Sequence, residues 1–332
     1  MEFLLLIIGF IILIKASDYF VDASINIAKT FKISEVVIGA TIVSIGTTLP
    51  ETMVSATSAF KGHSDISYGN AIGSIICNTA LIAAVSLIFA NGKVSKKALK
   101  TPILFFFTSF LVYAISAYVF KGFSRIAGII LVSIFVIYIL YIIKNNMNKK
   151  TIDEVKGIAK DKLLDVNKEE GKVSSYYIFK LMVILIVSAA FIAFASNLLV
   201  DNGVIIARKF GVSEAVIGLT IIAFGTSLPE LSTAVTSLIK GHSDLSLGNI
   251  IGADFFNIVT VTGVAAIITP FRLPNSKVIF SINSSLIVDL PLTLLVMLIL
   301  CMPPFLSGKT YRKQGLSLLF IYILFLIYQL KI

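Results

Sequence analysis

The sequence predicts an all-α integral membrane protein, with ten transmembrane helices arranged as two inverted five-helix repeats. Three observations lead to this fold class. First, 57% of the 332 residues are hydrophobic and only 14% are charged, whereas a typical soluble domain carries about 25% charged residues. Second, the chain divides into about ten apolar runs, each with the roughly 20 residues that cross a bilayer. Third, a long block of sequence recurs at a constant offset of 179 residues.

The first repeat is expected over residues 1–143 and the second over 174–332. A polar linker over 144–173 joins them, and its interleaved lysines and acidic residues are typical of a solvated segment. The first apolar run lacks a basic region before it and a cleavage site after it, so we expect it to be a retained span. The expected spans of the first repeat are 2–28, 34–60, 66–90, 101–120 and 124–143, and those of the second are 175–207, 213–239, 245–269, 279–301 and 314–331.

The distribution of Lys and Arg predicts the orientation in the membrane. Nineteen of the 28 basic residues fall on the side of the linker and eight on the side of the two termini, with Lys15 inside the first span. Because the cytoplasmic side is usually the basic one, we expect a multi-pass protein of the cell membrane with a cytoplasmic linker and extracellular termini. The net charge of +10 does not indicate nucleic-acid binding, since the basic residues lie between apolar runs.

The repeated block places one glutamate in the middle of each repeat. Between residues 34–78 and 213–257, 25 of 45 aligned positions are identical, and Glu51 and Glu230 each follow a Leu-Pro pair. A carboxylate inside a membrane span is energetically costly, so it indicates a functional site. Asp18, Asp22 and Asp201 fall nearer the ends of their spans, where we expect them to be solvated.

The residues around these glutamates favour a site for hard cations. Each proline leaves the carbonyl four residues earlier, of Gly46 or Gly225, without its helical partner, and a cation is one possible replacement. Oxygen donors of this kind suit calcium or sodium, and the spans contain no His or Cys cluster for a transition metal. The two following spans carry polar stripes and small-residue pairs that permit close helix approach, at Asn70, Ser74 and Asn78 with Gly69 and Gly73, and at Asn249 and Asn257 with Gly248 and Gly252.

On these motifs, the whole chain resembles the calcium/cation antiporter superfamily, and specifically the prokaryotic sodium/calcium exchangers. The resemblance implies alternating access around a central cluster of ion sites. It assigns Glu51 and Glu230 to calcium, together with the carbonyls of Thr47 and Thr226. The sodium sites that it implies use Ser44, Thr48, Ser74, Asn78, the carbonyl of Ala223, Ser227 and Asn257. The transported ions would be calcium and sodium, with no cofactor, and lipid would surround what we expect to be a monomer.

Two residues depart from the family pattern. Ala253 stands where the family has a serine, which removes an expected sodium ligand, and the next residue is an unusual acid, Asp254. Asp254 could couple protons to transport, so a calcium/proton antiporter is the alternative to calcium/sodium exchange. A passive cation channel is less favoured, because channel filters usually repeat in parallel through oligomeric symmetry. An enzyme is not expected, since the spans lack a metal-binding His pair and a Ser/His arrangement.

Overall fold

The computed structural model describes residues 2–62, 64–161, 175–210, 223–273, 278–279 and 282–331. Most of these residues are helical. The first half contains α1 (Glu2–Thr30), α2 (Glu35–Ile38), the π-helical turn η1 (Gly39–Val43), α3 (Ser44–Phe60), α4 (Ser64–Cys77), the π-helical turn η2 (Asn78–Ile82), α5 (Ala83–Phe89), α6 (Lys96–Tyr118), the strand β1 (Gly122–Phe123) and α7 (Arg125–Asp161).

The second half repeats the order of the long helices in its described parts, but its strands lie one connection earlier. It contains α8 (Ser175–Lys209), α10 (Ala223–Thr226), α11 (Leu228–Ile239), α12 (Ser243–Phe256), the π-helical turn η4 (Asn257–Thr262), α13 (Gly263–Ile268), the strands β2 (Phe271–Arg272), β3 (Val278–Ile279) and β4 (Ile282–Asn283), the π-helical turn η5 (Ser285–Asp289), α14 (Leu290–Ser307) and α15 (Arg312–Lys331). The strands form two short antiparallel pairs, β1 with β2 and β3 with β4.

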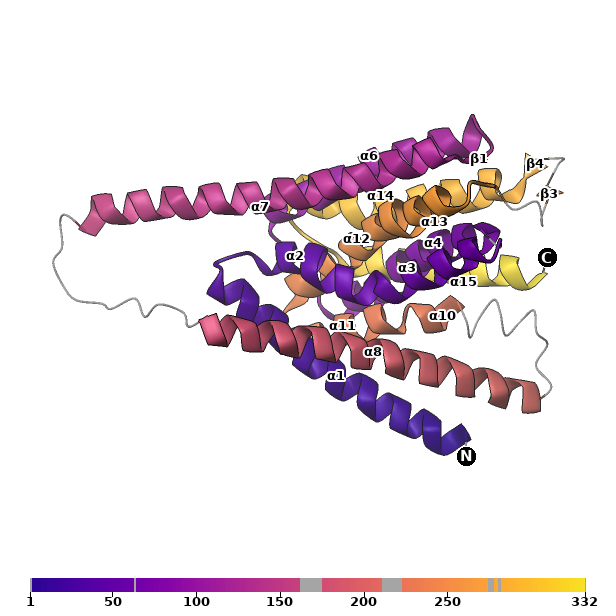
Figure 1. Ribbon diagram of the computed structural model, residues 1–332, viewed down its shortest axis with the longest axis horizontal. Helices are drawn as coiled ribbons and strands as arrows, with labels where there is room; N and C mark the ends of the chain where they lie inside the picture. Colours follow the sequence, from indigo (N-terminus) through magenta and orange to yellow (C-terminus); the bar gives the residue numbers. More distant parts are fainter. Residues whose placement is uncertain are drawn as a thin grey trace.

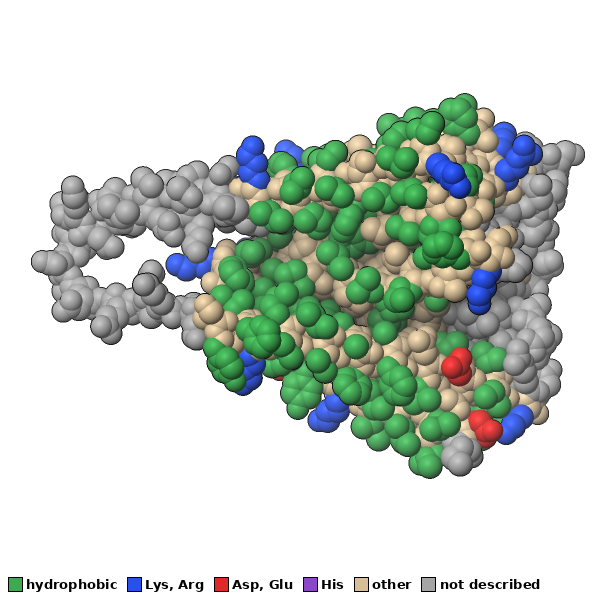
Figure 2. Space-filling model, viewed as in Figure 1, with side chains coloured by type: hydrophobic (Ala, Val, Ile, Leu, Met, Phe, Trp, Pro, Cys, Tyr) green, Lys and Arg blue, Asp and Glu red, His purple; other side chains and the backbone are tan. Residues whose placement is uncertain are grey.

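The helices have the length and composition of an integral membrane protein. Among the described residues, eight helical segments are long and apolar enough to cross a bilayer. Figure 2 shows apolar side chains over the middle of the visible face, with most Lys and Arg side chains towards its two ends. The expected all-α membrane class is therefore confirmed, whereas the count of ten spans stays a prediction, because α11 and α15 are not among the eight.

Most of the expected spans agree with the observed helices to within a few residues. Two spans differ more. The helical segment of the span predicted at 279–301 runs from Ser285 to Ser307, about six residues later. The pairing of β3 with β4 occupies the start of the predicted range, and the helix continues through Pro303 and Pro304 until Gly308 adopts a left-handed φ of 66°. Helix α7 continues to Asp161, well into the expected linker, and residues 162–174 and 211–222 lie outside the described part.

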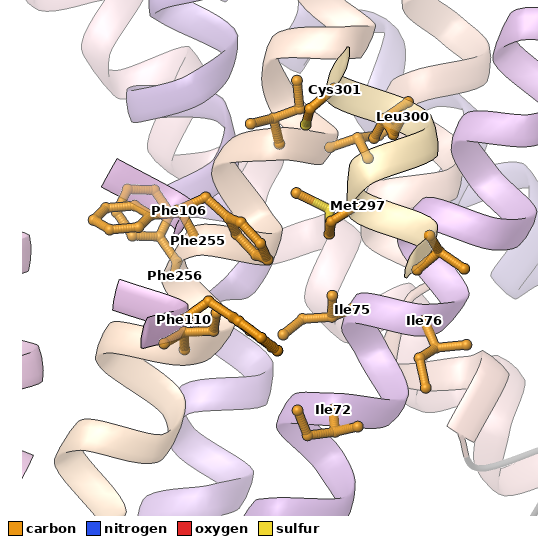
Figure 3. Close-up of a cluster of buried hydrophobic side chains, with 14 of the residues drawn as sticks. Ile72, Ile75, Ile76, Phe106, Phe110, Phe255, Phe256, Met297, Leu300 and Cys301 are labelled. Carbon is orange, nitrogen blue, oxygen red and sulfur yellow. The ribbon is translucent and has the colours of Figure 1, made fainter. Parts of the chain in front are cut away.

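The buried apolar side chains form two clusters. The larger one joins α4, α6, α12 and α14, and includes Ile75, Phe106, Phe255 and Met297 (Figure 3). The smaller one lies along α1 and α8, where Phe20 and Leu199 are buried. Figure 1 shows these two long helices together along one flank of the molecule. This smaller cluster also includes Ile38, Val43, Leu228 and Leu245, so the pair α1–α8 packs on α2–η1, α11 and α12 through apolar side chains.

The two repeats interlock through close backbone contact between α12 and the segment α2–η1. A Cβ atom added to Gly248 would lie 2.3 Å from the carbonyl oxygen of Val36, and one added to Gly39 would lie 2.4 Å from that of Leu245. The predicted close approach at Gly248 and Gly252 is thus confirmed. A Cβ atom added to Gly69 or Gly73 would meet no described atom within 4 Å, so close approach at that pair stays a prediction.

Candidate functional site

Glu51 and Glu230 are fully buried, and each comes from a different repeat. Both carboxylate oxygens of Glu51 lack a hydrogen-bond partner, as does Oε2 of Glu230. The remaining oxygen, Oε1 of Glu230, accepts a hydrogen bond of 3.2 Å from Oγ1 of Thr48, which lies in the other repeat. Leaving charged oxygens unpaired in a membrane interior is costly, so these atoms call for a cation or a proton.

The two prolines place these glutamates in different backbone settings. Helix α3 runs through Pro50 without ending, so Glu51 lies in the middle of a helix. In the second repeat the helix breaks at Ser227, and Pro229 lies in the first turn of α11, which puts Glu230 near a helix N-terminus. A helix N-terminus stabilises negative charge. The carbonyl of Gly225, which Pro229 leaves without a helical partner, accepts a hydrogen bond of 2.7 Å from Ser196 on α8.

The four asparagines of the polar stripes divide into two roles. Asn70 and Asn249 are structural: Asn70 donates to the carbonyl of Glu51 (3.1 Å), and Asn249 accepts from Oγ1 of Thr47 (3.3 Å). Asn78 and Asn257 are fully buried, and none of their side-chain nitrogen and oxygen atoms has a partner. Each of the latter two begins a π-helical turn, η2 or η4, a feature that is frequent at functional sites.

The other predicted ligands with described side chains are buried or half-buried. Ser44, Thr47, Thr48, Ser74 and Ser227 are buried, and the hydroxyl of Ser227 has no partner. Ser44 donates to the carbonyl of Thr41 within its own helical segment. Thr226 is half-buried and ends α10, the short helix that Ala223 begins. The expected ligand roles of all these groups stay predictions.

A third carboxylate, Asp254, is fully buried in the same helix as Asn249. Its Oδ2 accepts a hydrogen bond of 2.6 Å from Oγ1 of Thr79, and its Oδ1 has no partner. The contact with Thr79 was not predicted, although a hydroxyl directly after Asn78 in an apolar span was a signal for it. The buried ionisable residues of the described chain include these three carboxylates and no Lys, Arg or His.

Within the described residues, no three His, Cys, Asp or Glu side chains gather closely enough to hold a metal ion. A cation at this centre would therefore depend on amide, hydroxyl and carbonyl oxygens in addition to carboxylates. Such neutral oxygens are common ligands of calcium and sodium, and they hold an ion less tightly than a cage of carboxylates. Weaker binding is what a site that releases its ion requires.

The two inverted halves of this all-α membrane protein each bring a carboxylate to one buried polar centre. This arrangement defines the class of secondary transporters. The chain matches the family described as sodium/calcium exchanger protein over residues 1–144 and 180–331. It therefore belongs to the sodium/calcium exchanger family, and the resemblance inferred from the motifs is confirmed.

The chain is similar to several bacterial and archaeal membrane proteins over most of its length. The putative antiporter CaxA of Alkalimonas amylolytica is 34% identical over 80% of each chain. The inner membrane protein YrbG of Escherichia coli is 35% identical over 80% of this chain and 79% of its own. The sodium/calcium exchanger MaX1 of Methanosarcina acetivorans is 29% identical over 98% of this chain and 97% of its own.

The fold is also that of a solved exchanger. The sodium-calcium exchanger NCX_Mj, soaked with Na⁺ and Sr²⁺, superposes with a TM-score of 0.78 at 30% identity, covering 98% of this chain and 97% of the other. These structures concern extracellular ion exchange and occlusion of the binding site in that protein. The similarity over nearly the full length supports the inverted-repeat architecture.

Proposed function

We propose that the protein is a secondary active antiporter that exchanges calcium for sodium by alternating access. The observation that carries this proposal is the pair of buried glutamates, Glu51 and Glu230, whose carboxylate oxygens mostly lack protein partners. Two ionised carboxylates carry a charge that one calcium ion neutralises. Membership of the exchanger family supports the same conclusion.

Competition for shared ligands would produce the exchange. Calcium binds the two glutamates together with the carbonyls of Thr47 and Thr226, and sodium ions bind the same carboxylates from flanking positions at the hydroxyls and amides. Because the two kinds of ion require the same oxygens, they occupy the protein in turn. The pair α1–α8 would then slide past the larger core and expose the site to one side of the membrane at a time.

Uptake of radioactive calcium into proteoliposomes tests the proposal. We expect an outward sodium gradient to drive uptake by the natural protein, and Glu51→Gln or Glu230→Gln to abolish it, because each change removes one of the two shared charges. Ser243→Ala, at the half-buried start of α12, is a control that should retain uptake. Undiminished uptake by either glutamine variant would refute the assignment, and large unitary currents would indicate a channel instead.

A second candidate function is calcium/proton exchange, and the buried Asp254 favours it. This carboxylate has one oxygen without a partner and stands beside Ala253, where an expected sodium ligand is missing. Calcium flux driven by a pH gradient in the complete absence of sodium is the decisive measurement. Such flux, if lost in Asp254→Asn, would establish proton coupling, and its absence from the natural protein would reject this candidate.

A further inference from the structure

Lys240 joins the second repeat to α1 at the end of the molecule where α7 ends and α8 begins. Its position is the turn between α11 and α12, both of which belong to the second repeat. Its ammonium group lies 2.8 Å from Oδ1 of Asp18 and 2.7 Å from Oδ1 of Asp22, and donates a 3.0 Å hydrogen bond to the carbonyl of Asp18. Asp18 and Asp22 are thus exposed to solvent, as expected near a helix end, and are in addition paired with Lys240, which was not predicted.

The environment of Lys240 keeps this bridge charged. Its side chain is 22% exposed, whereas those of Asp18 and Asp22 are about half exposed. Partial burial by itself would lower the pKa of Lys240, but the hydrogen bonds and charges of Asp18 and Asp22 raise it above its ordinary value. One turn away, Nδ1 of His242 lies 2.8 Å from Oε1 of Glu35, which adds a second contact between the repeats.

The internal repeat contains a counterpart of this bridge at the opposite end of the molecule. At the offset of 179 residues, Lys61 corresponds to Lys240, Asp201 to Asp22, and Asn197 to Asp18. Lys61 and Asp201 are both exposed, and in the described part of the chain no ion pair joins them. Of two bridges that the sequence can form, one is therefore closed in this conformation and the other is open.

A second pair of matched residues shows the same difference between α1 and α8. Ser196 on α8 donates to the carbonyl of Gly225, at the break before α11. Its repeat counterpart on α1, Ser17, donates instead to Oγ of Ser232, at 2.8 Å. Helices α1 and α8 consequently contact the core at different places, as expected for an inverted repeat that is captured at one end of its cycle.

We propose that Lys240 and Lys61 are positioning residues that act in turn: Lys240 holds α1 through Asp18 and Asp22 in the present conformation, and Lys61 binds Asp201 in the opposite one. This inference rests on the alternating access proposed above. Breaking one bridge while forming the other keeps the exchange between the two conformations nearly balanced. Lys240 has two aspartates, whereas Lys61 has one aspartate and an asparagine, so the conformation described here is the favoured one of the two.

Distances between spin labels on the full-length protein in lipid nanodiscs can test the proposal. One labelled pair, Lys29→Cys with Ile239→Cys, reports on the end with the Lys240 bridge, and Ile239 is 81% exposed. A second pair, Phe60→Cys with Phe210→Cys, reports on the end with Lys61, and both native side chains are exposed. The native Cys77 and Cys301 are buried and should take up little label.

We expect Lys240→Gln to shift the ratio of short to long distances at its own end about three- to ten-fold towards long, in line with the strength of partly exposed ion pairs. Lys61→Gln should shift the same ratio in the opposite direction. The double variant should return towards the natural ratio, and Lys240→Asp combined with Asp22→Lys should restore part of the bridge. A residue with a merely structural role would produce neither opposite shifts nor rescue.

The outcomes separate this inference from the proposed function. If calcium and sodium change neither labelled distance in the natural protein, alternating access itself is wrong. If the ions do shift the distances but Lys240→Gln and Lys61→Gln move them equally or not at all, the bridges are overturned while the antiporter stands. Should Lys240→Gln fail to fold, Asp18→Asn with Asp22→Asn tests the same contact from α1.

Discussion

The two glutamates of the site differ in the support that the protein gives them. Glu230 accepts a hydrogen bond from Thr48 and lies in the first turn of α11, whereas neither oxygen of Glu51 has a partner. A carboxylate without donors depends more strongly on a bound cation than one that already accepts a hydrogen bond. At the proposed cation site, Glu51 would therefore depend on the bound ion more than Glu230, to which Thr48 already donates a hydrogen bond.

Replacing Thr48 by valine should weaken the site without disturbing the fold. The change removes the hydroxyl that contacts Glu230 at 3.2 Å, and a hydrogen bond to a charged group contributes about 1.5–3 kcal/mol. We expect the sodium concentration for half-maximal exchange to rise at least about ten-fold. Thr52→Val is the matched control, because Thr52 lies one turn further along α3, where its hydroxyl contacts the carbonyl of Thr48 and Oγ1 of Thr260 and no glutamate oxygen. Equal effects of the two variants would contradict the role given to Thr48.

At the level of elements, the contact between α12 and α2–η1 leaves no room for a side chain at two positions. A Cβ atom on Gly248 would lie 2.3 Å from a backbone oxygen of Val36, and one on Gly252 would lie 2.6 Å from the Cα atom of Ala40. Backbone atoms cannot move aside as a flexible side chain can. These glycines therefore fix how closely the second repeat approaches the first beside Ser44.

Gly248→Ala should destabilise the protein. Overpacking of a close contact typically costs about 1–3 kcal/mol, so we expect a lower Tm in detergent, together with reduced calcium exchange because α12 carries Asn249 and Asp254. The chain has no Trp, so tryptophan fluorescence cannot report its unfolding. Scanning calorimetry, or the onset of aggregation on heating, would measure the change in Tm. Ser243→Ala in the same helix should leave Tm nearly unchanged. An unaltered Tm in Gly248→Ala would show that α12 can move away from α2–η1 at little cost.

The sequence predicted those elements and residues that depend on local pattern. The repeat identified Glu51, Glu230 and the close-packed glycines of α12, because a recurring motif is recognised from the sequence without knowing which residues lie near it in the fold. The sequence pattern did not predict the contact of Lys240 with Asp18. These residues are 222 positions apart, and their contact depends on how α1 lies across the core. The start of η5 was likewise misplaced, because the pairing of β3 with β4 replaces helix in a stretch that is apolar enough for either.

At the scale of the whole molecule, the two termini lie at the end opposite to the junction of the two repeats. Figure 1 shows both termini at one end of the helices, and the end of α7 and the start of α8 at the other. An even number of crossings in the whole chain brings both termini to one side of the membrane. An odd number in each repeat brings the junction of the repeats to the other side. The bias of basic residues towards the linker end favours that end as cytoplasmic, and much of the bias comes from the linker itself.

Labelling of single cysteines in intact cells should establish this orientation. With a membrane-impermeant maleimide, we expect Arg125→Cys to react from outside, and Lys97→Cys to react only after the cells are permeabilised. Both native side chains are exposed and lie at opposite ends of the molecule, whereas Cys77 and Cys301 are buried. The opposite pattern would place the Lys240 bridge on the outside. The same labelling therefore shows on which side of the membrane the contact of Lys240 with Asp18 and Asp22 lies.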